Sequence, residues 1–417
     1  MQNTTQPTAA KPLAGVRVVD LTRALAGPYA TLLLAGLGAE VIKVEDPTSG
    51  DLARENSPYV GRDGIVQRKR HDDDVSISHL TRGRGKYGVS LNLKAPGAIE
   101  VFRDLVRVSD VVVENFASGT ADRLGVGYAT ASAVNPRIVY CSLSGFGAGV
   151  SEGSKAMDVI IQALSGAMYA SGDVGGAPVR FGVPIADMLA PVFAVIGILA
   201  ALKQREHTNQ GQHVDVSMLG ALTSFVAIEN WRAMELAGIP ARTGLTVPRL
   251  SPFGVFRCAD GYVAIVAVAD AMFGTLCAAM DMPLLDDPRF ATRDARVANA
   301  SELERRIGEW CGARGMDEVV SRLSQRGIPV APVRSPVEAL SDPRVLARGE
   351  VAAVSHPAYP ADHGLRTAGI PIMFSGARCE IDDTLAVHVG EHNHAIYQGV
   401  LGYSADQLAA LRAERVI

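Results

Sequence analysis

The stretch Gly15-Val-Arg-Val-Val-Asp-Leu21, together with the residues that follow it to Glu45, decides the fold of this chain. It is a short run rich in β-branched residues, which favour strands. A helix-like segment, Pro28 to Gly36, comes next, and Ala39-Glu-Val-Ile-Lys-Val-Glu45 predicts a second strand. A strand, a helix and a strand in this order indicate a βαβ unit, whose two strands lie parallel in one sheet.

The same alternation continues to about residue 225. We predict further strands at 87–93, 110–115, 138–143 and 213–218, and helices at 96–109, 156–170 and 188–202. Such a pattern predicts an α/β fold with a doubly wound, Rossmann-like parallel sheet. The turn after the first strand contains Gly27, which lets the backbone approach another group closely. It contains no Gly-x-Gly-x-x-Gly, so the sequence does not support a dinucleotide site.

The length of 417 residues exceeds the ~250 to 300 residues at which a single core usually splits into domains. We expect residues 1–225 to form the first part of a large α/β domain and residues 226–335 to form a smaller α+β domain. Residues 336–417 are expected to return to the large domain. Within the smaller domain, residues 253–267 predict a hairpin, and the proline-rich stretch 327–336 predicts the exit linker.

Charge and cysteine content narrow the class of partner. A net charge of −4 with mixed signs gives no basic field for nucleic acid or anionic lipid, so the expected partner is a small molecule. Five scattered cysteines without a Cys-x-x-Cys pair argue against a disulfide framework and a zinc site. The run His71-Asp-Asp-Asp74 does not predict a metal site either, because consecutive residues cannot all face one ion.

Two segments bear on the cellular location. Residues Met1 to Lys11 lack the apolar core of a signal peptide. The apolar run Met188 to Leu202 falls short of the ~18 residues that a bilayer span needs, and we predict that it is a buried helix. The sequence therefore predicts a cytoplasmic protein without membrane attachment.

Asp187 ends the sequence Arg180-Phe-Gly-Val-Pro-Ile-Ala-Asp187, directly ahead of the apolar run. A carboxylate at the start of a helix faces free backbone N–H groups, which favour negative charge. It is therefore either a helix cap or a catalytic group held in its ionised form. Position alone favours the cap, because aspartate is common there.

Basic side chains concentrate in residues 62–86, which carry many charges of both signs. Such a run is usually a solvated loop. The alternative is a mobile flap over a ligand, with Arg84 and Lys86 directed at phosphates. Lys86 is the stronger candidate because it opens a predicted strand.

Asn115 and Phe116 follow the strand 110–115, at the carboxyl edge of the predicted sheet, where ligands bind in such folds. They could contact an adenine ring or a pantetheine arm, or they could be an ordinary turn cap and a core aromatic. Arg123 follows shortly afterwards and could pair with a phosphate.

A series of motifs runs from about Leu13 to near the C-terminus. In order they are Leu21-Thr-Arg-Ala-Leu-Ala-Gly-Pro28, Leu37-Gly-Ala-Glu-Val-Ile-Lys-Val-Glu45, Ser49-Gly-Asp51, Val113-Glu-Asn-Phe116, Asp122-Arg-Leu-Gly125, Ser142-Leu-Ser-Gly-Phe-Gly147, Ala163-Leu-Ser-Gly166, Asp187 and Gly390-Glu-His392. With this order and spacing, the chain resembles the class III CoA transferases, also called the CaiB/BaiF family.

The resemblance implies that Asp187 is the catalytic nucleophile. In this family the carboxylate attacks an acyl-CoA thioester to form an aspartyl anhydride, and the CoA thiolate then converts the anhydride into an aspartyl-CoA thioester. This exchange conserves the activation of the acyl group without ATP or metal. The contacts to CoA that the resemblance implies are Ala26, Lys86, Asn115, Phe116, Arg123 and Lys155.

The resemblance also implies a homodimer of two interlocked, ring-like chains, with CoA as a substrate and product and no permanently bound cofactor. We expect the donor to be succinyl-CoA or another small acyl-CoA, and the acceptor to be a small polar acid such as a dicarboxylate. Arg249 or Arg84 could hold a distal carboxylate.

Three departures from related patterns are informative. Asp46 stands where some family members have an arginine for the CoA nucleotide. Residues 248–254 replace the glycine-rich loop of formyl-CoA:oxalate transferases, which argues against oxalate as the acceptor. The α-methylacyl-CoA racemases of the same superfamily add a histidine one position before the residue matching Asp158, and here that position is Met157. A racemase needs two bases, and with Met157 at this position the second base is missing. A racemase is the alternative function, and a catalytically silent CoA-binding protein is a third possibility.

Overall fold

The computed structural model of the chain describes residues 10–149 and 155–417. The expectation about a signal peptide therefore falls almost entirely outside the described residues. The chain divides into two compact units, of which the first comprises Met1–Ser165, Gly182–Val226 and Leu340–Ile417, and the second Gly166–Phe181 and Ala227–Ala339. The sequence had placed residues 166–181 in the large domain, but they belong to the second unit.

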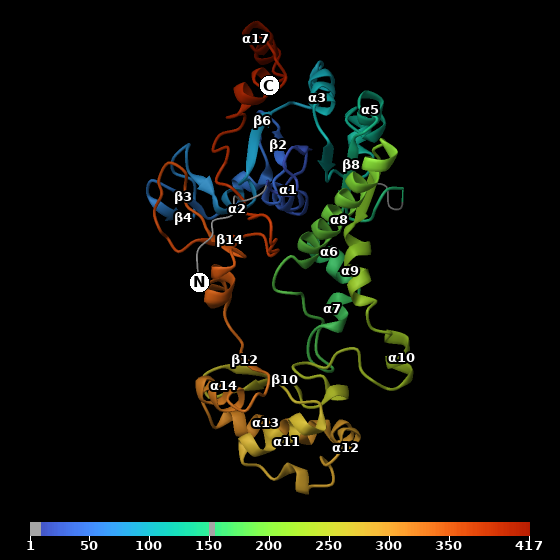
Figure 1. Ribbon diagram of the computed structural model, residues 1–417, viewed down its shortest axis with the longest axis vertical. Helices are drawn as coiled ribbons and strands as arrows, with labels where there is room; N and C mark the ends of the chain where they lie inside the picture. The colour runs from blue at the N-terminus through green and yellow to red at the C-terminus, as the bar shows by residue number, and fades with distance from the viewer. Residues whose placement is uncertain (1–9, 150–154) are drawn as a thin grey trace. The chain divides into compact units, whose positions relative to one another are not determined.

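A six-stranded sheet with only parallel pairs forms the centre of the first unit (Figure 1). Its order is β6-β2-β1-β7-β8-β9, so the strand order reverses between β1 and β7. This is the order of a doubly wound, Rossmann-like sheet, and the predicted fold class is confirmed. The strands are β1 (Arg17–Asp20), β2 (Glu40–Glu45), β6 (Lys86–Ser90), β7 (Val111–Glu114), β8 (Val139–Ser144) and β9 (His213–Ser217).

The central strands are runs of β-branched residues that are buried on both faces, as expected where helices cover a parallel sheet. Val19 pairs in register with Ile42 on one side and with Val112 on the other, and all three are inaccessible to solvent. The helices that connect the strands are α1 (Ala26–Gly36), α3 (Ala98–Arg107), α4 (Thr120–Arg123), α5 (Tyr128–Val134), α6 (Asp158–Leu164) and α8 (Ile185–Thr208), and α9 (Met218–Val226) follows the last strand.

The C-terminal residues pack against this sheet. Tyr397 and Leu408 belong to the same buried cluster as Phe102, and the Tyr397 hydroxyl donates to the Ser90 carbonyl at 2.7 Å. Contacts between residues far apart in the sequence therefore hold the C-terminal residues against the large sheet. The elements of this stretch are α16 (Pro343–Ala347), β13 (Val351–Ala353), β14 (Arg366–Ala368), the π-helical turn η4 (His394–Gln398) and α17 (Ala405–Ala413).

The charged stretch that the sequence predicted as a solvated loop or a mobile flap contains regular structure. Strands β4 and β5, which belong to a small antiparallel sheet of order β4-β3-β5, and helix α2 lie within it. The alternating apolar residues of this sheet, such as Val60 and Val75, are buried. The elements are η1 (Leu52–Glu55), β3 (Tyr59–Gly61), β4 (Gly64–Val66), β5 (Val75–Ser76) and α2 (Ile77–Arg82).

Helix α8 differs from its prediction in length and burial. It has 24 residues, and its most apolar 18-residue window has a mean hydropathy of 2.3 with 39% of the window buried. By length and composition it could cross a membrane, which is weak evidence because core helices of soluble proteins pass the same test. The predicted buried helix is only partly buried: Ala190, Ala194 and Ile198 are buried, whereas Val192, Ile196 and Leu199 remain exposed in the single chain.

The second unit is built on a three-stranded antiparallel sheet of order β10-β11-β12. The predicted hairpin is confirmed, with Phe253 paired to Val266, but the stretch predicted as a linker contributes the edge strand β12. The predicted helix 156–170 is broken at Gly166, whose φ of +86° ends the first part. The elements are α7 (Ala167–Ala170), α10 (Trp231–Leu236), η2 (Pro248–Leu250), β10 (Phe253–Arg257), β11 (Tyr262–Val266), α11 (Asp270–Met280), η3 (Leu284–Asp286), α12 (Arg293–Ala298), α13 (Ala300–Gly312), α14 (Met316–Ser324), β12 (Val330–Pro332) and α15 (Pro336–Leu340).

Candidate active site

A cavity of about 380 Å³ lies at the carboxyl edge of the large sheet. The segments after β1 and β7 form two of its walls, and these are the strands between which the strand order reverses. Open α/β sheets bind their ligands at such a reversal. The cavity is lined by Ala24, Leu25, Ala26, Asn115, Phe116, Ala117, Ser118, Leu143, Ser144, Gly145, Phe146, Gly147, Lys155, Ala156, Met157, Asp158, Asp187 and Met218.

Asp187 enters this cavity from the first turn of helix α8. The helix begins without a side-chain cap of its own. Within residues 10–149 and 155–417, the half-buried carboxylate of Asp187 accepts no hydrogen bond. The capping role that its position favoured is therefore wrong, and the carboxylate is available to a ligand.

Asp158 supplies the missing cap from the first turn of helix α6. Its Oδ1 accepts the backbone N–H of Ala186 at 2.8 Å and that of Asp187 at 3.4 Å, and its Oδ2 accepts from Gln162 Nε2 at 2.7 Å. The structure shows that Asp158 also caps a second helix, 28 residues away, and lines the cavity beside Asp187.

The environment of Asp187 changes its acidity. Burial, followed by the negative charge of Asp158, raises the pKa of Asp187 to about 6, and the positive charge of Arg82 opposes this rise. Burial disfavours the charged form because it removes solvating water. The carboxylate is thus ionised at neutral pH but weakly solvated, which suits a nucleophile.

Four of the six residues predicted to contact CoA line the same cavity, namely Ala26, Asn115, Phe116 and Lys155. The Asn115 side chain has a further task, because its Oδ1 accepts from Arg23 N at 2.7 Å and its Nδ2 donates to Arg23 O at 2.9 Å. It thus fixes the neighbouring wall of the cavity. Phe116 offers a half-buried aromatic surface, and Lys155 is exposed.

Lys86 and Arg123 do not line the cavity. Lys86 is 1% exposed, and its Nζ bonds to Asp20 Oδ2 at 3.1 Å, Thr31 Oγ1 at 2.7 Å and Pro28 O at 2.9 Å. It opens β6 at the amino end of the strand, whereas the cavity lies beyond the carboxyl ends. Arg123 is exposed and donates to Thr120 Oγ1 at 2.7 Å.

Arg84, Arg249 and Asp46, which the sequence analysis also singled out, each contact protein groups outside the cavity. Arg84 is buried and donates to the Ala368 carbonyl at 3.0 Å, and Arg249 pairs with Glu229 in the second unit at 2.6 Å. Asp46 accepts the backbone N–H groups of Thr48 and Ser49 at 2.9 and 3.1 Å, which shapes the turn after β2. None of these three residues lines the cavity.

Sequence reasoning missed Arg82, which ends helix α2 and whose charge acts on Asp187. Its Nε donates to the Ser78 carbonyl at 2.9 Å, and in the described part of the chain this is its one hydrogen bond. No sequence signal separates Arg82 from the other arginines of its charged stretch. Arg82 does not line the cavity, but its charge acts on Asp187. The helix that carries it, α2, contacts α1, and that contact is tertiary.

Residues 13–393 match the profile of CoA-transferase family III. The chain belongs to CoA-transferase family III. The predicted family is thereby confirmed, and with it the expectation that the chain is a class III CoA-transferase, an enzyme class that uses CoA thioesters as substrates.

Named relatives of family III align over most of this chain. It is 37% identical to a succinyl-CoA:mesaconate CoA-transferase of Haloarcula marismortui, over 87% of this chain and 90% of the relative. It is 35% identical to a formyl-CoA:oxalate CoA-transferase of Streptomyces coelicolor, over 98% of this chain and 100% of the relative. Among solved structures, a CaiB/BaiF family protein from Brucella suis superposes with a TM-score of 0.81 at 31% identity, covering 94% of this chain and 100% of the other.

Proposed function

We propose that this family III enzyme transfers CoA from succinyl-CoA, or another small acyl-CoA, to a small dicarboxylate, with Asp187 as the nucleophile. One observation carries the role of Asp187. Its carboxylate faces a cavity without a hydrogen-bond partner among the described residues, while another carboxylate, Asp158, caps its helix. The names of similar proteins that act on mesaconate, glutarate and citramalate support a dicarboxylate acceptor.

The proposed reaction exchanges acyl bonds without net oxidation. A carboxylate oxygen of Asp187 attacks the thioester carbonyl of the donor, and CoA leaves as a thiolate to give a mixed anhydride. The thiolate then attacks the aspartyl carbonyl, which releases the donor acid and leaves an aspartyl-CoA thioester. The acceptor carboxylate attacks this thioester and expels the thiolate again. Attack of the thiolate on the acceptor's acyl carbon gives the new acyl-CoA and regenerates Asp187.

The walls of the cavity suit the two parts of this substrate. Apolar groups from Phe116, Phe146 and Met218 can cover an extended thioester arm, and a water-poor surface protects the anhydride from hydrolysis. Met157 is 70% exposed at the cavity. Since no histidine is among the residues that line the cavity, the second base that a racemase needs is not provided there.

We assign the distal carboxylate of the acceptor to Arg82 rather than to Arg84 or Arg249. Arg82 acts electrostatically on Asp187, and among residues 10–149 and 155–417 neither of its Nη groups donates a hydrogen bond. A guanidinium binds a carboxylate with two parallel hydrogen bonds. Replacing Arg82 with methionine is expected to raise the KM for succinate at least tenfold, while the KM for a monocarboxylate of similar size changes little. An equal rise for both acids would contradict this assignment.

The proposed assembly is a homodimer in the cytoplasm. Apolar side chains on α8 and α9 are exposed in the single chain, with Phe193 at 36%, Ile196 at 55% and Phe225 at 57%. A contiguous apolar surface of this kind is typical of protein interfaces, and a second copy of the chain would cover it. Light scattering of the purified protein should give twice the mass of 43.9 kDa, and replacing Ile196 with glutamate should give monomers.

The reaction is tested with a panel of carboxylates, each assayed with succinyl-CoA and with acetyl-CoA. The panel includes mesaconate, glutarate and oxalate, because relatives of similar identity are named for each of them. We expect the highest kcat/KM with a dicarboxylate longer than oxalate. Hydroxylamine added after donor acyl-CoA alone should trap Asp187 as its hydroxamate, which mass spectrometry detects. An unmodified Asp187 under these conditions would contradict its role as nucleophile.

A further inference from the structure

The loop between β1 and α1, residues Leu21–Leu25, forms one wall of the cavity through Ala24 and Leu25. Ala24 has a φ of +65°, which is the left-handed region that L-residues with a side chain rarely adopt. Such a conformation persists only where the surroundings enforce it. The groups that keep Ala24 in this conformation therefore help to shape this wall of the cavity.

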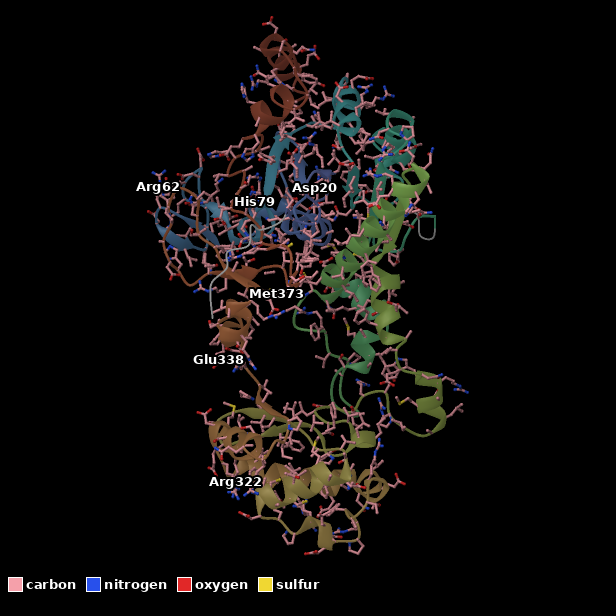
Figure 2. The ribbon with its side chains drawn as sticks, viewed as in Figure 1. Asp20, Arg62, His79, Arg322, Glu338 and Met373 are labelled. Carbon is pink, nitrogen blue, oxygen red and sulfur yellow. The ribbon has the colours of Figure 1, made fainter. Side chains whose placement is uncertain are left out.

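Side chains from three other strands or loops fix the backbone of this loop. Asp51 Oδ1 accepts the N–H of Ala24 at 2.9 Å, and the Lys43 ammonium donates to the carbonyl of Thr22. Asp20 Oδ1 accepts from both the N–H of Thr22, at 2.9 Å, and its hydroxyl, at 2.5 Å. Figure 2 labels Asp20 among the strands of the first unit.

Glycine completes the packing of this wall. A Cβ at Gly27 would lie 2.4 Å from the Cβ of Thr22 and 3.0 Å from Cγ of Asn115. The start of α1 thus rests directly on the loop and on the amide that holds Arg23. The sequence expectation that Gly27 permits a close approach is confirmed, and the group approached is the loop itself.

Asp51 and Lys43 form a buried pair beneath the loop. Lys43 Nζ lies 3.1 Å from Asp51 Oδ2, and the side chains are 7% and 2% exposed. Asp51 also accepts the N–H of Ala53 at 2.9 Å, while its own N–H donates to Glu45 Oε1 at 2.9 Å. The ion pair with Lys43 and the hydrogen bond from Ala53 thus fix the position of the Asp51 carboxylate. The fixed carboxylate can in turn fix the backbone N–H of Ala24.

We propose that Asp51, paired with Lys43, is a positioning residue that keeps Ala24 left-handed and so preforms the wall that receives CoA. The pair is costly to desolvate, and apolar residues of the same volume often serve the core equally well. What an apolar pair could not supply is an acceptor for Ala24 N–H and a donor for Thr22 O. This role of Asp51 rests on the proposed function, because it requires that CoA binds in the cavity.

The test is titration calorimetry of the full chain with CoA alone, which requires no turnover. Replacing Asp51 with alanine is expected to weaken CoA binding about tenfold, because the loop must be ordered on binding. Asp51→Asn keeps an oxygen acceptor and is expected to weaken binding about threefold. In the Ala24→Gly background the effect of Asp51→Ala should shrink below threefold, since glycine adopts the left-handed region freely.

Asp110 provides the matched control at the amino edge of the same sheet. It accepts the N–H of Arg17 at 2.9 Å and pairs with Arg205 at 2.9 Å, so Asp110→Ala removes comparable interactions away from the cavity. We expect Asp110→Ala to lower the melting temperature but to leave the Kd for CoA within twofold of wild type. Should Asp51→Ala not fold, Asp51→Asn is compared with Asp110→Asn instead.

Two outcomes would overturn the proposal. One is a folded Asp51 variant that is less stable but binds CoA as wild type does, which would make Asp51 a structural residue only. The other is an unchanged effect of Asp51→Ala in the Ala24→Gly background, which would break the link to the left-handed residue. Failure of the wild-type chain to bind CoA would instead overturn the proposed function itself.

Discussion

Asp158 and Asp187 share one helix terminus: Asp158 caps helix α8 through its Oδ1, and Asp187 extends from the first turn of that helix. The cap satisfies the backbone N–H groups that would otherwise bind the Asp187 carboxylate. It also places a second negative charge beside Asp187, which contributes to its raised pKa. The two effects leave Asp187 without a hydrogen-bond partner in the part of the chain that the structure describes, and unusually basic for an aspartate.

Replacing Asp187 with asparagine should abolish CoA transfer while CoA still binds. An amide cannot form the anhydride, so we expect a loss of about 10³-fold or more in kcat. Steady-state kinetics and calorimetry with CoA measure the two quantities. Near wild-type turnover in the folded variant would remove Asp187 from the mechanism.

The rate should fall on the acidic side of neutrality. Because the pKa of Asp187 is raised to about 6, protonation below that pH removes the nucleophile. We expect kcat/KM for the donor to decrease tenfold per pH unit below about 6, rather than near the ordinary aspartate value of 3.8. A profile that stays flat down to pH 5 would contradict this assignment.

Because the pKa of Asp187 is raised, replacing this carboxylate with a neutral amide should stabilise the folded protein, and the gain should depend on pH. With a folded pKa above the unfolded value, the native state binds more protons between 3.8 and about 6. The free energy of unfolding therefore decreases as pH rises through this window, and the loss persists at neutral pH. The difference between these two pKa values is worth about 3 kcal/mol, and solvent screening of the half-buried carboxylate reduces it. Asp187→Asn should therefore stabilise the protein by about 1 to 2 kcal/mol at pH 7.5 and have little effect at pH 4. Thermal unfolding at both pH values tests this.

The variant Asp158→Asn should distinguish the two roles of Asp158, as the cap of helix α8 and as a negative charge beside Asp187. The amide oxygen still accepts the N–H of Ala186, but the negative charge beside Asp187 is lost, so the pKa of Asp187 should fall. The acidic limb of the pH profile then moves to lower pH. Arg82→Met provides the opposite control, because it removes the positive charge that lowers this pKa. Shifts in the same direction for both variants would exclude the electrostatic explanation.

Transfer should proceed without α-proton exchange. The proposed steps make and break bonds only at acyl carbons, so a chiral 2-methylacyl-CoA in heavy water should keep its stereochemistry and gain no deuterium. Activity should also survive a chelator, since the donor thioester already supplies the activated acyl group. Rapid deuterium incorporation without CoA passing to an added acid would establish the racemase alternative.

Local sequence patterns were sufficient for much of the fold. Strands such as Val111–Glu114 are so rich in β-branched residues that periodicity identifies them, and their spacing required parallel crossovers. The pattern could not show that the stretch after Pro329 adds an edge strand, because three residues carry too little signal. Nor could it show the exposure of Ile196, since an apolar helix has the same sequence in a core and at an interface.

The sequence by itself determined the alternation of strands and helices in the large sheet, the family and the prediction that Asp187 is the nucleophile, because these depend on residues that are neighbours or recur at fixed spacing. Only the tertiary structure decided what surrounds them. Lys86 turned away from the cavity to pair with Asp20, 66 residues earlier, and Asp158 became the cap that frees Asp187. Such contacts join distant segments, and their energy depends on burial and hydrogen-bond geometry that no local pattern contains.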